Sequence, residues 1–196
     1  MTKPSRASRS LLRSFLGALV AVVVLATAAA AAPLPVEGYA PYEPQTVCRS
    51  KPLVGTVSLA RWIDASYGGG TPRATMRSCG SSGTSEHKDG RAIDWTMSAT
   101  KPRHRRIVNR FLARIFAADE LGNNHALARR MGVMYIIWND RIYSSYRGFE
   151  PRAYLNSGCK SLSTCSKTLR HRDHVHISLS NAGAKAQTSW YLAPAG

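Results

Sequence analysis

The chain has 196 residues, of which 27 are basic and 11 are acidic, so its formal net charge is +16. This length suits one domain with a sizeable hydrophobic core. The sequence contains no internal repeat and no heptad run, which excludes repeat arrays and coiled coils. The excess of positive charge indicates either an anionic partner or a generally cationic surface.

Residues 1–32 have the pattern of a secretory signal peptide. Four basic residues and no acidic one occupy positions 1–13, an apolar run covers 15–25, and small residues continue to residue 32. Because this run is shorter than the about 20 residues of a membrane-spanning helix, we expect cleavage between residues 28 and 32. An uncleaved N-terminal membrane anchor is the minor alternative. The protein is therefore expected to be secreted or cell-wall associated, with 23 of its 27 basic residues and all 11 acidic ones in the mature chain.

The cysteines all follow the signal segment, and there are four of them: Cys48, Cys79, Cys159 and Cys165. An even number of cysteines in an exported chain indicates disulfides. Four cysteines allow three connectivities, and local closure favours Cys48–Cys79 and Cys159–Cys165. A zinc site made by the cysteines is disfavoured, because the sequence has no C-x-x-C pair.

The mature chain divides into a short N-terminal linker or strap and one domain. Residues 33–47, rich in proline and tyrosine, are expected to form an extended linker or a strap, and residues 48–196 the domain. Apolar spacing predicts helices at 56–66, 102–119 and 124–131, and the second of these shows the clearest three- and four-residue period.

Strands are expected at residues 91–95, 133–138, 142–144 and 174–180, the middle two forming a hairpin. The last strand alternates most clearly: Val175, Ile177 and Leu179 would face the core, whereas His174 and His176 would face the other side. Together these elements predict an α+β fold, a small antiparallel sheet with helices packed on one face. The polar face would carry the functional site.

Two separate clusters of metal-binding residue types indicate one zinc site. His87 and Asp94 are seven residues apart, and Gly90 between them lets the backbone fold back so that both reach one ion. His176 supplies a third ligand from the polar face of the last strand. Zinc takes histidine nitrogens and carboxylate oxygens, and a catalytic site leaves one position open for water.

The same residues carry a resemblance to a known group of metallopeptidases. The first cluster matches the S-x-H-x-x-G-x-A-x-D signature of the D-alanyl-D-alanine carboxypeptidase family with Ser85, His87, Gly90, Ala92 and Asp94. The H-x-H at residues 174–176 is similar to that of the wider group, which includes lysostaphin-type peptidases, murein endopeptidases and the hedgehog signalling domain. The chain also resembles exported actinobacterial proteins with an uncharacterised domain of this group.

The resemblance implies a zinc peptidase in which His87, Asp94 and His176 hold Zn²⁺. The general base stays open: the carboxypeptidase branch has Glu three residues before the last His, and Asp173 stands there in this chain. Either Asp173 acts through a water, or His171 and His174 act as in the endopeptidase branch.

Further roles are open among the neighbouring residues. Arg77 is either a group that binds the developing oxyanion or a substrate carboxylate, or an ordinary surface residue. Ser85 and Ser178, with Asp173 as a further candidate, could accept hydrogen bonds from the metal-binding histidines. Glu86 and Asp89 are expected to be exposed or to form a turn.

The predicted function is cleavage of peptidoglycan peptides by a secreted, zinc-dependent carboxypeptidase or endopeptidase. Its partner would be a peptidoglycan peptide or another anionic cell-wall polymer, with no stable protein partner. The alternative is a non-hydrolytic, zinc-containing cell-wall binding module. Specific nucleic-acid binding is disfavoured, because the basic residues are not interleaved with aromatic ones along a groove.

Overall fold

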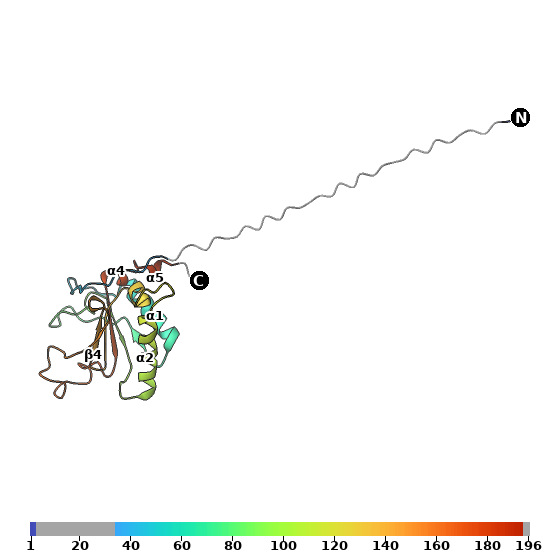
Figure 1. Cartoon of the computed structure of the whole chain (residues 1–196). Helices are drawn as coiled ribbons and strands as arrows, with labels where there is room; N and C mark the ends of the chain where they lie inside the picture. The colour runs from blue at the N-terminus through green and yellow to red at the C-terminus, as the bar shows by residue number, and fades with distance from the viewer. Residues whose placement is uncertain (3–33, 194–196) are drawn as a thin grey trace. The chain divides into compact units, whose positions relative to one another are not determined.

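One antiparallel sheet organises the domain (Figure 1). It has six strands in the order β1-β2-β6-β3-β4-β5. The computed structural model describes residues 1–2 and 34–193, so all but the first two residues of the expected signal peptide lie outside the described residues. The strands are β1 (Pro72–Arg73), β2 (Ala92–Trp95), β3 (Val133–Trp138), β4 (Arg141–Ser144), β5 (Pro151–Ala153) and β6 (Val175–Leu179). The helices are α1 (Val54–Tyr67), α2 (Pro102–Phe116), α3 (Ala126–Arg130), the 3₁₀ turn η1 (Ser145–Arg147), α4 (Asn181–Ala184) and α5 (Ser189–Leu192).

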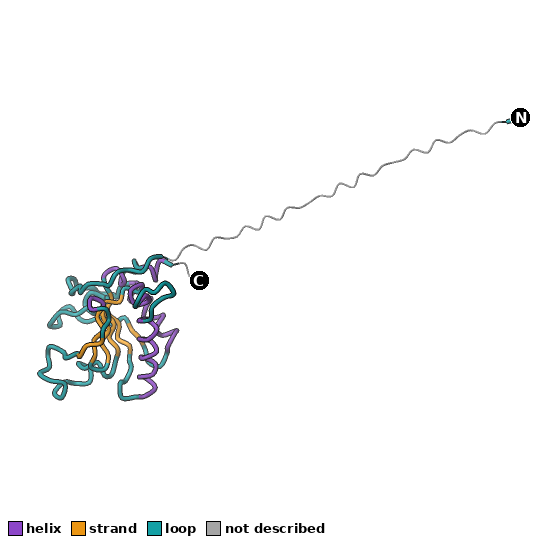
Figure 2. Tube along the Cα trace, viewed as in Figure 1, coloured by secondary structure: helices purple, strands orange, loops and turns teal. Residues whose placement is uncertain are grey.

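The helices α1 and α2 lie on one side of the sheet (Figure 2). Their apolar side chains pack against that face and build the core. From α2 the core takes residues at the helical period, Ile107, Val108, Phe111, Leu112 and Ile115. From the central strands it takes alternate residues, among them Ile93, Trp95, Val175, Ile177 and Leu179. The opposite face carries a smaller apolar cluster around Tyr135 and Ile137. The predicted α+β fold with helices on one face is therefore confirmed.

Strand β6 lies between β2 and β3, so its polar side chains sit in the middle of the sheet. The register places His176 opposite Asp94 on β2 and opposite Ile137 on β3. Because side chains alternate along a strand, His176 and Asp94 emerge on the face away from α1 and α2. Long-range strand pairing thus joins the two clusters, in which Asp94 and His176 are 82 residues apart in the sequence.

The β3–β4 hairpin and both disulfides agree with the sequence predictions. Asn139 and Asp140 turn the chain with positive φ angles of 50° and 62°, as a tight two-residue hairpin requires. The disulfides are Cys48–Cys79 and Cys159–Cys165, which is the pairing favoured by local closure. Among residues 1–2 and 34–193, no helix has the length and apolar character needed to span a lipid bilayer.

Two helices are shorter than their apolar patterns predict. Helix α2 ends at Phe116 rather than 119, because Ala117 is extended and Asp119 accepts hydrogen bonds from the backbone of Leu121 and Asn123 in a turn. Helix α3 begins at Ala126, because His125 before it adopts a left-handed conformation. Strand β1 was not predicted, and its two residues pair with β2 at the sheet edge.

The residues that precede the first helix lie along the domain as a strap. Tyr39 hydrogen-bonds His125 through its hydroxyl at 2.8 Å, and the Glu37 carbonyl accepts from Arg129 at 2.6 Å. The Glu43 carbonyl accepts from the buried Arg91 at 2.8 Å. The strap thereby reaches the loop between His87 and Asp94.

Candidate metal centre

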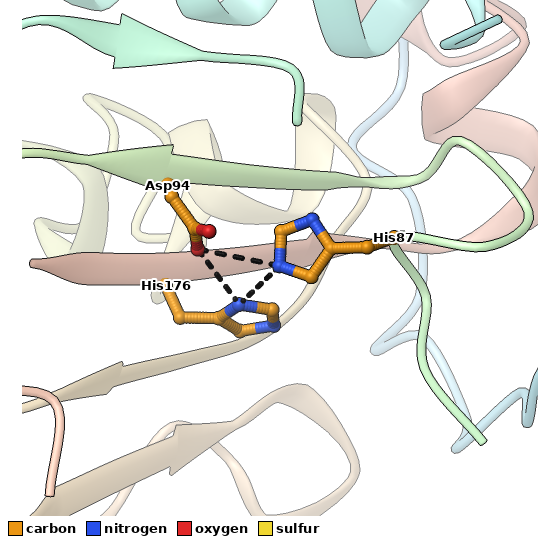
Figure 3. Close-up of side chains that lie close together, drawn as sticks. All are labelled: His87, Asp94 and His176. Atoms are coloured by element: carbon orange, nitrogen blue, oxygen red, sulfur yellow. Dashed lines mark hydrogen bonds and ion pairs between the residues drawn. The ribbon is translucent and has the colours of Figure 1, made fainter. Parts of the chain in front are cut away.

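Three side chains bring one potential ligand atom each to a single point (Figure 3). His87 Nε2 lies 3.3 Å from Asp94 Oδ1 and 3.1 Å from His176 Nδ1. His176 Nδ1 lies 3.2 Å from the same Asp94 oxygen. These are the three ligands predicted from the sequence, and the structure brings them together.

The loop that returns His87 to Asp94 depends on Gly90. This residue has a φ of +77°, and a Cβ there would lie 2.9 Å from the Lys51 carbonyl oxygen. A side chain would therefore meet both backbone strain and a steric clash. The Gly90 carbonyl accepts a hydrogen bond from Thr56 Oγ1 at 2.8 Å, which ties the loop to α1.

The three atoms have the spacing of metal ligands. Atoms bound tetrahedrally to zinc at about 2.0–2.1 Å lie about 3.3 Å from one another, and the observed separations are 3.1, 3.2 and 3.3 Å. Two imidazole nitrogens and one carboxylate oxygen also form a donor set used by catalytic zinc sites. The residues present therefore fit a zinc ion.

The atoms of these side chains that point away from the cluster are engaged by neighbours. His87 Nδ1 lies 2.9 Å from the Thr75 carbonyl oxygen, and the Thr75 hydroxyl donates to Asp94 Oδ2 at 3.1 Å. His176 Nε2 lies 2.8 Å from Ser178 Oγ. Such contacts fix the ring orientation and point the other ring nitrogens into the cluster. Thr75 carried no signal in the sequence, because its position depends on β1 pairing with β2.

The electrostatics favour the metal-binding protonation state for Asp94 and His176 but not for His87. Burial opposes ionisation of Asp94, but hydrogen bonds from His176 and His87 outweigh it and hold the Asp94 pKa below its usual range. Burial lowers the pKa of His176 and keeps that ring neutral. An ionised carboxylate and a neutral imidazole are the forms that bind a cation. Burial alone would lower the pKa of His87, but the hydrogen bond and the charge of Asp94 outweigh it and raise that pKa, so a bound metal would displace a proton from this ring.

A cavity of about 260 Å³ opens on the cluster. Of the remaining predicted site residues, Arg77, Ser85, His171 and His174 line it. Ser85 does not contact a histidine ring: its hydroxyl accepts from the backbone N–H of His87 at 3.4 Å, within the turn.

The carboxylate of Asp173 is turned toward His174 and Thr168 and is not part of the cavity lining. Its Oδ1 lies 2.7 Å from His174 Nδ1, and its Oδ2 accepts from the Thr168 hydroxyl at 2.6 Å. The other nitrogen of His174 lies 3.7 Å from Asp94 Oδ1. His174 thus stands between Asp173 and the ligand cluster.

The buried ring of His171 packs 4.7 Å from that of His174. His171 adopts a left-handed conformation with a φ of 50°. Burial, reinforced by the neighbouring histidines, lowers the pKa of His171 to about 3. This ring is therefore neutral at physiological pH.

Glu86 and Asp89 lie in the turn at residues 86–90, which is one of the two expected alternatives, but they are buried rather than exposed, at 6% and 3% exposure. Glu86 lines the cavity, and its Oε2 accepts a hydrogen bond of 2.6 Å from the Tyr135 hydroxyl. The Tyr135 ring stacks on His176 at 5.6 Å. A buried tyrosine hydroxyl needs a polar partner. Tyr135 in a predicted buried strand was therefore the one sign in the sequence that a polar side chain such as a carboxylate would lie against β3.

A model of the VldE C-terminal domain family matches residues 49–161, which is more than half of the chain. The matched segment includes His87 and Asp94 and ends before His176. No curated protein and no solved structure shows significant similarity to the chain. By its sequence, the chain belongs to the VldE C-terminal domain family.

Proposed function

We propose that the protein is a secreted, zinc-dependent peptidase that cleaves the peptides of peptidoglycan. The observation that carries this proposal is the convergence of His87, Asp94 and His176 at the floor of a cavity. The two signature motifs, similar to those of D-alanyl-D-alanine carboxypeptidases and related murein peptidases, supply the substrate class. The two disulfides indicate an oxidising compartment, as expected for an exported wall enzyme.

His87, Asp94 and His176 would hold the zinc ion. Zinc bound at such a site supplies Lewis-acid activation of water and of the scissile carbonyl. The remaining chemistry falls to side chains of the cavity.

His174 is the residue we assign to proton transfer. Its Nε2 faces the ligand cluster, and its Nδ1 is 2.7 Å from the Asp173 carboxylate, which is itself held by Thr168. A carboxylate in this position orients the ring. His174 Nε2 can therefore take a proton in the cavity and return it to the leaving amine, while Asp173 acts as a positioning residue.

Arg77 provides a cation at the mouth of the cavity. Its side chain is exposed and lines the cavity. A guanidinium can bind a carboxylate through two hydrogen bonds, so we assign Arg77 to the terminal or side-chain carboxylate of a wall peptide.

A non-hydrolytic, zinc-containing wall-binding module is the second candidate, and one observation favours it. The position at which the carboxypeptidase branch has its glutamate carries Asp173, and this carboxylate is turned toward Thr168 and His174 rather than into the cavity. If His174 does not exchange protons, the site would bind wall peptides without cleaving them.

Digestion of purified wall peptides separates the two functions. The oxidised, zinc-loaded protein is incubated with the peptides, and mass spectrometry detects new amines or free D-alanine. We expect products from the wild type, a rate about 100-fold or more lower in His174→Ala with zinc content unchanged, and full activity in His104→Gln, a histidine of α2 outside the cavity. Zinc retained without any product would assign the binding module instead.

A further inference from the structure

Helix α2 carries a stripe of arginines along one side. Arg103, Arg106, Arg110 and Arg114 follow one another at steps of three, four and four residues, so they lie within about a quarter-turn of one another around the helix. The stripe is about 16 Å long at a rise of about 1.5 Å per residue. The helix contains no acidic residue.

These guanidinium groups have no carboxylate partner. Among the described residues, no ion pair within 4.0 Å involves an arginine of α2, although Arg91, Arg130 and Arg170 elsewhere are each paired. Asp64 is the one carboxylate of α1, the neighbouring helix, and it pairs with none of them. Four like charges in a row repel one another, and an anion bound along the stripe would relieve that repulsion.

The stripe borders a cavity, and aromatic rings of α1 position its arginines. Arg103, Arg106 and Arg110 line a cavity of about 460 Å³ together with Ile107 and Tyr67. The guanidinium carbon of Arg110 lies 5.6 Å from the centre of the Tyr67 ring, and that of Arg114 lies 5.0 Å from the centre of the Trp62 ring.

Tyr67 is the residue of α1 that lines this cavity. Its hydroxyl is buried and has no hydrogen-bond partner among the described residues. A buried polar group without a partner is unusual in a folded protein. Because that oxygen is enclosed, the groups that the cavity offers to a ligand are its guanidiniums.

The arginine stripe and the cavity beside it form a groove between α1 and α2. We propose that this groove binds a linear polymer that carries phosphodiester groups along its length. Arginine presents a planar fork that binds phosphate through two hydrogen bonds, and successive guanidiniums along 16 Å of helix suit successive phosphates of one chain. The long shape of the stripe, together with its unpaired charge, favours a polymer over a single small anion.

A lipid surface and a nucleic acid fit this groove less well. A helix that lies in a membrane interface exposes large apolar side chains, whereas the large exposed apolar residues of the described chain all lie outside α2. Single-stranded nucleic acid needs aromatic faces for base stacking, and Trp62 and Tyr67 already carry guanidiniums against their rings.

The groove is separate from the metal centre. The apolar side of α2 packs on the face of the sheet that carries Ile93 and Ile177, whereas Asp94 and His176 emerge on the other face. Polymer could therefore be held on one side of the sheet while the cavity at the metal centre stays open. The proposal does not rest on the peptidase function.

Binding to a synthetic poly(glycerol phosphate) of about ten units tests the proposal. The test variant is Arg103→Gln/Arg106→Gln/Arg110→Gln. The matched control is Arg141→Gln/Arg147→Gln/Arg152→Gln, which removes three exposed arginines near β4 and β5 and has the same net charge. Calorimetry at 0.1 M salt should show binding by the wild type, a loss of about tenfold or more with a weaker salt dependence in the test variant, and a change below about twofold in the control.

Four results would overturn the proposal. The first is no binding by the wild type, and the second is equal weakening of both triple variants, which would mean that only net charge matters. The third is tighter binding to anionic phospholipid vesicles or to oligothymidylate with the same dependence on the stripe. The fourth is equally tight binding to polyglutamate, which would remove the assignment to phosphate. Zinc content and melting temperature, measured on each variant, separate these outcomes from loss of the metal centre or of the fold.

Discussion

The buried arginine in the site loop gives the sharpest stability prediction. Arg91 lies between His87 and Asp94 in the sequence and is 1% exposed. Its guanidinium is 2.9 Å from Asp89 Oδ2 and donates to the Leu179 and Glu43 carbonyl oxygens at 2.7 and 2.8 Å. One side chain therefore joins the loop to β6 and to the strap.

The change Arg91→Met keeps most of the side-chain volume but leaves the Asp89 carboxylate, 3% exposed, without its partner. Removal of one member of a buried ion pair costs about 3–5 kcal/mol. A domain of this size loses about 2–4 °C of Tm per kcal/mol, so Tm should fall by roughly 10 °C. Because the same loop carries His87, zinc affinity should fall as well.

Urea unfolding of the oxidised protein measures this effect. The double variant Arg91→Met/Asp89→Asn should recover a large part of the loss, because neither member then leaves a buried charge unpaired. Arg141→Met, at an exposed position of β4, should change the free energy of unfolding by less than about 0.5 kcal/mol. A loss below about 1 kcal/mol for Arg91→Met would refute the reasoning.

Three other variants test separate parts of the structure. Thr75→Val removes the hydroxyl that donates to the Asp94 carboxylate, so zinc affinity should fall about 10–100-fold. Competition with a chromophoric chelator measures this affinity, and an unchanged value would refute the role of Thr75. Hydrogen bonds from Arg170 hold the pKa of Asp140 below its ordinary value, so this pair contributes its full stabilisation above the ordinary aspartate pKa and loses it as pH falls through the lowered pKa of Asp140. Unfolding measured over a pH series should therefore show a smaller acid-induced loss of unfolding free energy in Asp140→Asn than in the wild type. Identical pH curves for the two proteins would contradict this role of the pair. Replacing Cys48 and Cys79 by serine opens a loop that spans 31 residues, which should cost about 3–4 kcal/mol in the unfolding free energy; a cost below about 1 kcal/mol would show that the bridge is not a main constraint.

The sequence was informative where the spacing of apolar residues along a segment matched the face of that segment that packs into the core. Alternation in residues 175–179 placed Val175 and Ile177 in the core and His176 on the opposite face, and the sheet has this arrangement. Asp94 could be assigned to the same face as its partner because β2 also alternates. These patterns survive folding because each face of a strand meets one environment along its whole length.

What could not be predicted depends on contacts between distant segments. Glu86 is buried because Tyr135 on β3 covers it, and Asp89 because Arg91 turns back on it. Thr75 reaches the cluster only through the short pairing of β1 with β2. None of these contacts leaves a periodic pattern in the chain. The candidate metal ligands could therefore be predicted from the sequence, but the residues that contact them could not.

The arginines of α2 show a different limit. Their spacing was visible, and the helix they belong to was predicted, but the groove depends on Tyr67 and Trp62 of α1 lying against them. Sequence alone therefore indicated a cationic chain and not a cationic site.

Zinc content of the exported, oxidised protein is the most direct test of the metal centre. We expect about one zinc ion per wild-type chain, lost in both His87→Ala and His176→Ala, while His104→Gln retains it with an unchanged melting temperature. A wild type that takes up no zinc under saturating conditions, or a His176→Ala variant that holds zinc as tightly as the wild type, would contradict the assignment of His87, Asp94 and His176 as one metal site.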